Sequence, residues 1–296
     1  MRTPALLSIL ALSALALSAC KGGESPLPAV LGEDPAAPYV ASEWVLPSSA
    51  GSAQPNLVAT DDGRLLLTWI NSVPGRRNAL RFAALGDNGR WSSEARTVVV
   101  GDALMANWAD VPHIMATPDG ALWVHWLQKA GGTGYAADIA LSRSIDGGFN
   151  WAAPVTVNLD EVVAEHGFAA LWPAGEDSLG IAWLDGRNNA MSGGNKGEGD
   201  EEGMAHGRTA VALDDDHAWM LWVREGKDGQ SLWLSRRSPD LAEEMQRMEV
   251  AKLQGRGKAT GFPQLALHHG NAYVVWTDVI DGAPQLRGAI VAPANG

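Results

Sequence analysis

Three arginines, Arg187, Arg208 and Arg224, are the side chains of this sequence best suited to binding an anion. A guanidinium group can donate two parallel hydrogen bonds to a carboxylate, so three such groups gathered at one place would form a carboxylate clamp. Asp185 stands two residues before Arg187. An ion pair between these two that only shapes their loop is an equally good interpretation of the segment.

Two of the arginines, Arg208 and Arg224, belong to a larger set of polar residues that the sequence places at the ends of repeated strands. Five β-rich runs end in a tryptophan, and the residue two positions after each tryptophan is polar. Because neighbouring strands run antiparallel, the loops after these runs and the loops before the preceding strands open on one face. We expect a pocket there, although solvent-exposed loops without a binding function explain the polar loop ends equally well. The residues are Asn71, Gln128, Asp185, Arg224 and Asp278 after the tryptophans, and Asp110, His113, His166 and Arg208 before the strands.

The repeated runs predict an all-β fold of the β-propeller type. Successive run-ending tryptophans are 57, 57, 39 and 54 residues apart, and three of these four intervals suit a four-stranded blade. A proline stands 13 or 14 residues before three of the tryptophans and marks the start of a first strand, since proline cannot donate to a sheet ladder. The runs are Leu65–Trp69, Leu122–Trp126, Leu179–Trp183, Ala218–Trp222 and Ala272–Trp276; third strands are expected at Ala79–Leu85, Asp138–Ser144, Ser231–Arg237 and Gln285–Val291, and fourth strands at Arg96–Val100, Pro154–Val157 and Arg247–Leu253.

Two irregularities interrupt this pattern. The segment Asp185–Gly207 has no apolar alternation and is predicted to be a mobile loop, so the third blade lacks its outer two strands. The last blade has no fourth strand at its C-terminal end, and Glu43–Pro47 is predicted to supply it and to close the ring. We therefore expect five readable blades, or six if a divergent blade is hidden.

The turn Ser144–Trp151 carries the clearest motif. Ser144 and Asp146 can bond their own backbone, Gly148 suits a positive φ, and Trp151 can pin the loop. The spacing Ser-x-Asp-x-Gly-x-x-Trp resembles the Asp-box, or BNR repeat, of sialidases and related β-propellers. A degenerate copy of the motif keeps the same spacing, with alanine for glycine and methionine for tryptophan, at Ser238, Asp240, Ala242 and Met245.

The resemblance to sialidase-like propellers implies an expectation for the chemistry. Such an enzyme uses three arginines around a sugar carboxylate, an aspartate as acid and base, and a tyrosine nucleophile beside a glutamate. Asp185 would be the acid and base, and Arg187, Arg208 and Arg224 the clamp. The tyrosine cannot be nominated, because Tyr39 is assigned to a tether, Tyr273 to mid-strand and Tyr135 to a glycine-rich loop. In that family the Asp-box is structural and faces away from the ligand.

The N-terminus predicts export. Residues 1–19 have an early positive charge, an apolar run and then small residues, the layout of a signal peptide. The end of this stretch, Leu17-Ser18-Ala19-Cys20, resembles the lipobox of bacterial lipoproteins, which implies lipidation of Cys20, the only cysteine. We expect a lipidated cysteine and flexible tether at 20–40 and the propeller at 41–296, held on a membrane surface, with an outer-membrane location facing the periplasm or the cell surface.

Composition excludes several other classes. A formal net charge of -12, without a basic stripe, argues against a nucleic-acid partner. No zincin, P-loop or dinucleotide motif is present, so we expect no cofactor. Adjacent side chains on a strand point apart, so no metal site is expected from His268 and His269.

Two functions remain open. The favoured hypothesis is an envelope-anchored, monomeric propeller that is non-catalytic or degenerate and binds a glycan or an envelope protein, with Gln128, His113, His166 and Asp278 joining the arginines at the binding site. The alternative is an exo-α-sialidase-type glycoside hydrolase acting on sialylated or related acidic sugars.

Overall fold

The structure is a computed structural model that describes residues 38–72, 74–91, 94–131, 134–187, 208–226 and 229–294. The predicted signal peptide, Cys20 and nearly all of the predicted tether lie outside this part, as do positions 188–207 of the segment predicted to be a mobile loop. No helix within the described ranges is long and apolar enough to span a membrane.

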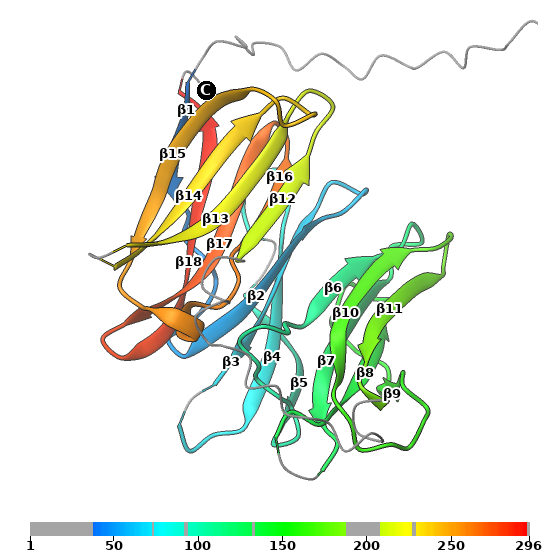
Figure 1. Cartoon of the computed structure of the whole chain (residues 1–296). Coiled ribbons are helices and arrows are strands. Elements are labelled where there is room, and N and C mark those ends of the chain that lie inside the picture. The colour runs from blue at the N-terminus through cyan, green and yellow to red at the C-terminus, as the bar shows by residue number, and fades with distance from the viewer. Residues whose placement is uncertain are drawn as a thin grey trace, which may run out of the picture. The chain divides into compact units, whose positions relative to one another are not determined.

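The described chain is all-β apart from a short 3-10 helix, and its strands form antiparallel sheets that follow one another along the sequence (Figure 1). The first sheet contains β2 (Ser52–Ala59), β3 (Leu65–Asn71), β4 (Asn78–Leu85) and β5 (Arg96–Gly101). The second contains β6 (His113–Ala116), β7 (Leu122–Lys129), β8 (Ala137–Ser144) and β9 (Val155–Thr156), and the third contains β10 (His166–Pro173) and β11 (Leu179–Asp185). The fourth contains β12 (Thr209–Leu213), β13 (Ala218–Gly226), β14 (Gly229–Arg237) and β15 (Glu244–Leu253). The fifth contains β16 (Gln264–His268), β17 (Asn271–Ile280), β18 (Ala283–Pro293) and β1 (Tyr39–Glu43), and η2 (Gly257–Thr260) precedes it.

The repeats and the sheets agree closely. Each predicted tryptophan run lies in the second strand of one sheet, and the predicted third and fourth strands lie within observed ones, except that β9 covers only the two central residues of the predicted Pro154–Val157. The third sheet has only two strands in the described part of the chain, as the short interval between tryptophans predicted.

A segment before the first sheet supplies the fourth strand of the last sheet, but the predicted bounds of this strand were wrong. β1 pairs with β18 over Tyr39–Glu43, not over Glu43–Pro47. Tyr39 therefore belongs to a strand rather than to the tether, and it is buried against Trp219, with ring centroids 5.0 Å apart. The aromatic ring explains the shift, because pairing at Tyr39 buries a large side chain that the predicted register would leave in water.

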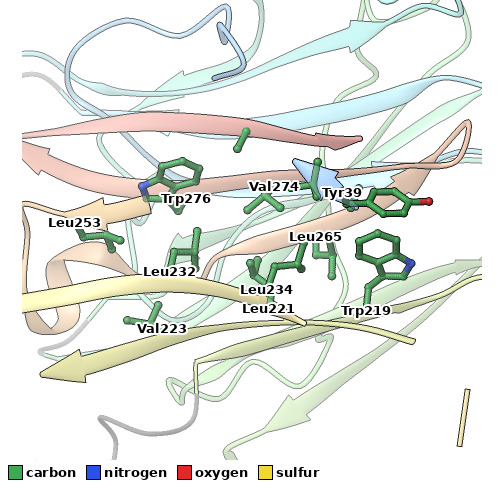
Figure 2. Close-up of a cluster of buried hydrophobic side chains, with 13 residues drawn as sticks. Tyr39, Trp219, Leu221, Val223, Leu232, Leu234, Leu253, Leu265, Val274 and Trp276 are labelled. Atoms are coloured by element: carbon green, nitrogen blue, oxygen red, sulfur yellow. The ribbon is translucent and has the colours of Figure 1, made fainter. Parts of the chain in front are cut away.

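The core is distributed between sheets, as face-to-face packing of sheets requires. One apolar cluster joins the fourth and fifth sheets through Trp219, Leu234 and Val274 (Figure 2). A second joins the fifth and first sheets, and a third joins the first and second. A smaller cluster lies between the second and third sheets and includes Leu127 and Ala169.

The turn Ser144–Trp151 has the hydrogen bonds that its sequence predicted. Ser144 Oγ donates to Asp146 Oδ1 at 2.8 Å and accepts from the backbone N–H of Gly148 at 2.9 Å. Gly148 has a φ of 86°, and Trp151 packs edge-on against Phe82 of the first sheet at 5.7 Å. Ser238 and Asp240 repeat the first of these bonds at 2.6 Å in the turn between β14 and β15. Both turns lie between the third and fourth strands of their sheets.

We predict that Gly148→Ala lowers the free energy of unfolding by roughly 2–5 kcal/mol, from backbone strain at positive φ and from overpacking. A Cβ at this position would lie 2.1 Å from the Phe82 ring, which is buried. Gly89→Ala is the matched control, because Gly89 also has a positive φ of 69° but has open space around it. Urea unfolding followed by circular dichroism measures both, and equal losses in the two variants would contradict the role of Phe82.

Candidate functional site

A hollow of about 300 Å³ opens where the first and fifth sheets meet the loop before β6. We call it the mouth. Its lining includes Gln54 of β2, Trp108 before β6, Gly261 before β16 and Gly282 in the turn after β17. Loops before first strands and loops after second strands therefore do share one face, as antiparallel alternation predicted.

Two first strands carry the same backbone irregularity beside this region. β2 bulges between Ala53 and Asn56, and β10 bulges between Gly167 and Ala170. Each bulge contains a residue other than glycine at positive φ, Gln54 at 56° and Phe168 at 50°. Such conformations cost about 1–3 kcal/mol, and bulges of this kind re-aim side chains next to functional sites.

The mouth combines an aromatic face with an amide that lacks a partner. Trp108 stacks on Phe262 with ring centroids 5.8 Å apart, and the ammonium group of Lys258 lies 5.8 Å from the Trp108 ring. Gln54 Oε1 is buried and accepts no hydrogen bond from the residues that the structure describes. A buried amide oxygen without a donor is costly, and a rotation of the half-buried Gln54 side chain toward the mouth would let a ligand hydroxyl or N–H relieve this cost.

Asp110 lies just behind the second bulge. Its side chain is buried, and Oδ2 accepts a hydrogen bond of 2.6 Å from the N–H of Phe168. The pKa of the Asp110 carboxyl is raised to about 6, mainly by burial and to a lesser extent by the charge of Glu165, against the opposing hydrogen bond from Phe168. A Cβ on Gly167 would lie 2.0 Å from Asp110 Oδ2, so this approach depends on glycine.

A pair of histidines lies between the second and third sheets. His113 and His125 are opposite each other on β6 and β7, with ring centroids 5.2 Å apart. Burial lowers the pKa of His113 to about 4, and burial together with His113 lowers the pKa of His125 to about 3. Both rings are therefore neutral at physiological pH.

Three predicted site residues meet in an ionic cluster at the edge of the same junction. His166 Nε2 lies 3.0 Å from Asp160 Oδ2 and 3.5 Å from Asp185 Oδ1, while His166 Nδ1 lies 3.0 Å from the carbonyl oxygen of Ala137. Arg187 Nε lies 3.1 Å from Asp160, and its Nη2 lies 2.5 Å from Asp185. The hydrogen bond from Arg187 is the main cause of a lowered Asp185 pKa.

The three arginines of the predicted clamp do not gather at one place. Arg208 and Val223 face each other across β12 and β13, so Arg208 points to the buried side of the fourth sheet, whereas Arg224 points to the other side. Arg208 Nη1 donates to the Gly257 carbonyl at 2.8 Å and to Thr260 Oγ1 at 2.5 Å. Arg224 lies 5.7 Å above the ring of Trp233.

The remaining predicted residues have local structural contacts. Asp278 is buried and accepts backbone N–H groups of Gln254 and Gly255 at 3.0 and 2.8 Å, which fixes the loop before η2. Asn71 donates to the carbonyl oxygen of Ala50 at 3.1 Å. Gln128 lies in β7, where it bridges to Leu104.

Sequence reasoning missed Gln54 and Trp108 at the mouth. Both lie outside the positions that follow the repeated tryptophans. Pro55 directly after Gln54 marked the strand but gave no sign of the bulge, because a positive φ at glutamine has no sequence signature.

No protein-family model and no curated protein matches the chain. Among solved structures it is similar to a protein of unknown function from Dyadobacter fermentans, with 11% identity and a TM-score of 0.52 over 88% of this chain and 100% of the other. It also aligns with a GH43 beta-xylosidase/alpha-arabinofuranosidase from a compost microbial metagenome, with 12% identity and a TM-score of 0.47 over 87% and 97% of the two chains. A GH43_1 enzyme from Xanthomonas citri aligns with 13% identity and a TM-score of 0.44 over 87% and 93%. The likeness to the Dyadobacter protein bears on the fold alone.

We predict that the histidine pair makes the fold sensitive to acid. The folded-state pKa values of His113 and His125 lie below the ordinary value of 6.5, so their contribution is complete above pH 6.5 and is lost as the pH falls toward 4 and 3. Each adds a slope of about 1.4 kcal/mol per pH unit to the free energy of unfolding in this window. His125→Leu should remove one such slope between pH 6 and 4, as urea unfolding at several pH values would measure. An unchanged slope would contradict the assignment.

Proposed function

We propose that this domain is a sialidase-like, non-catalytic propeller that binds a glycan at the mouth. The pairing of an aromatic face, Trp108, with an unpartnered buried amide oxygen, Gln54 Oε1, carries the proposal. Sugars present apolar C–H faces and hydroxyl donors, and these are the groups that a tryptophan ring and an amide oxygen accommodate. A volume of about 300 Å³ suits one or two sugar rings.

The ionic cluster supports binding over sialidase catalysis. The Asp185 carboxylate pairs with Arg187 and has a lowered pKa, which is the wrong direction for a general acid at neutral pH. Arg187 is already paired with two carboxylates, and Arg208 is engaged with backbone carbonyls. Arg187, Arg208 and Arg224 therefore do not offer three guanidinium groups to one substrate carboxylate.

The tyrosines also argue against sialidase catalysis. Tyr39 packs on Trp219 and Tyr273 is buried in the fifth sheet. Tyr135 is 59% exposed, and no base within the described part of the chain is hydrogen-bonded to its hydroxyl. A tyrosine nucleophile needs a base within hydrogen-bond reach.

The cellular setting that fits this function is the bacterial envelope. We propose that the chain is exported and held on a membrane through a lipid on Cys20, with the mouth available to envelope glycans. The early positive charge, apolar run and lipobox-like end of residues 1–20 support this proposal.

We predict that Trp108→Ala weakens glycan binding at least roughly tenfold, the size of effect expected for a buried aromatic anchor. The purified protein would first be screened on a glycan array, and the best ligand then titrated into wild type and variant. Trp172→Ala is the control, since Trp172 is an exposed tryptophan on β10 that does not line the mouth. A folded protein that binds no glycan, or equal affinities in wild type and Trp108→Ala, would refute the proposal.

Glycoside hydrolysis is the second candidate function, and Asp110 is the observation that favours it. A buried carboxyl whose pKa is raised to about 6 is suited to protonate a leaving group, and Glu165 supplies a second carboxylate nearby. This role belongs to Asp110 rather than to Asp185. Hydrolysis of fluorogenic glycosides, including a sialoside, distinguishes the two candidates.

We predict that Asp110→Asn raises the free energy of unfolding at pH 8 by about 1–2 kcal/mol, because it removes a desolvated charge and loses part of one hydrogen bond. The raised folded-state pKa means that the aspartate's favourable contribution is complete below about pH 3.8 and is lost as the pH rises through about 6. The gain should therefore vanish at pH 3.5. A gain that does not depend on pH would contradict the raised pKa.

A further inference from the structure

Asp87, His268 and His269 form a cluster away from the mouth. His268 is the last residue of β16, His269 follows it in the turn to β17, and Asp87 lies in the turn between β4 and β5. One ligand atom from each side chain lies within 4.8 Å of those of the other two, and His269 Nε2 is 4.0 Å from Asp87 Oδ1. We call this group the histidine turn.

The backbone brings the two imidazoles together, contrary to the sequence expectation. Adjacent side chains on a strand point apart, but His269 has left the strand and has a φ of 49°, followed by Gly270 at 73°. The two rings consequently lie side by side, with centroids 4.0 Å apart at an interplanar angle of 51°. Two nitrogen ligands therefore face one side of the turn.

The cluster combines one fixed ligand with two accessible ones. His268 is only 8% exposed and packs against the ring of Tyr273 at 6.0 Å, and its Nε2 makes no hydrogen bond in the described chain. The side chains of His269 and Asp87 are 60% and 76% exposed. A solute can therefore reach His269 and Asp87, while the buried His268 ring is held in place by its neighbours.

The donor set selects a class of ion. Two neutral imidazoles with one carboxylate suit Zn²⁺ and its neighbours in the transition series, whereas Ca²⁺ and Mg²⁺ prefer oxygen donors. Zn²⁺ binds such ligands at about 2.0–2.2 Å, so two ligands of one ion lie at most about 4.4 Å apart. Small rotations of the two exposed side chains are enough to satisfy this limit.

The ionic cluster of Asp160, His166 and Asp185 also has metal-ligand residue types, but its carboxylates are already paired with a cation. Arg187 lies 3.1 Å from Asp160 and 2.5 Å from Asp185, so a cation already neutralises both carboxylates. A divalent ion would have to displace the guanidinium group. The histidine turn has no arginine or lysine within ion-pair distance of Asp87 in the described chain.

We propose that the histidine turn binds one divalent transition-metal ion of the Zn²⁺ class, with Asp87, His268 and His269 as its protein ligands. Three protein ligands leave a fourth tetrahedral position for water or for a donor from a partner. The turns β16–β17 and β4–β5 both lie at the strand ends opposite the mouth, so the metal and the glycan would use different faces (Figure 1).

Isothermal titration of Zn²⁺ into the untagged protein at pH 7.5 tests the proposal. We expect one ion per chain, and no comparable binding of Ca²⁺. His269→Ala should weaken Zn²⁺ binding by at least roughly tenfold, since even the loss of an outer-shell partner of a metal ligand costs 10–100-fold. His217→Ala, at a histidine in the turn between β12 and β13, should leave the affinity unchanged.

Two further readouts separate this site from others. Titration with Co²⁺ should give the visible absorption bands of a tetrahedral site in wild type and not in Asp87→Ala, with circular dichroism showing that the variant is folded. Absence of Zn²⁺ binding in wild type, or affinity that survives both His269→Ala and Asp87→Ala, would overturn the proposal. Loss of affinity in Asp160→Ala but not in these variants would also overturn it, because it would place the ion at the ionic cluster.

Discussion

The pairing of β1 with β18 is the contact on which the arrangement of the sheets depends. It joins residues 248 positions apart, such as Ser42 and Ile290, and gives the fifth sheet the fourth strand that its own sequence lacks. The same segment delivers Tyr39 to the core between the fourth and fifth sheets and Trp44 to the core between the fifth and first. Gln246 of β15 adds two hydrogen bonds to the backbone of Tyr39, at 2.9 and 2.8 Å. One short strand thus caps an exposed edge and links three sheets.

The mouth follows from how the first strands begin. A first strand that paired regularly from its first residue would alternate its side chains between neighbouring sheets, where they would be buried. Bulges at Gln54 and Phe168 break this alternation at the rim, and the strain at positive φ is tolerated because the paired strands on either side hold the backbone. The bulge at Phe168 also presents its N–H to Asp110 and so places a carboxyl in a buried position.

The two clusters of ionisable residues show how one neighbour decides the chemistry. Asp160, Asp185 and His166 have Arg187 beside them, and the result is an ion-pair network that fixes the end of β11. Asp87, His268 and His269 have no such cation beside them among the described residues, and they remain open to solvent on one side. The residue types are nearly the same, but the charge balance differs.

The sequence by itself determined the repeats, the strand order and the local turns. The tryptophan spacing located the sheets and the two-stranded third sheet, and Ser144, Asp146 and Gly148 specified their own turn, because these features depend on residues close together in the chain. Tertiary structure decided the remaining features. Pairing with β18 sets the start of β1 at Tyr39. Arg208 lies on the buried side of the fourth sheet, opposite to Arg224. The left-handed backbone at His269 brings two imidazoles together. Each of these three features depends on partners distant in sequence or on a strained φ. Neither cause leaves a recognisable pattern in the amino-acid sequence.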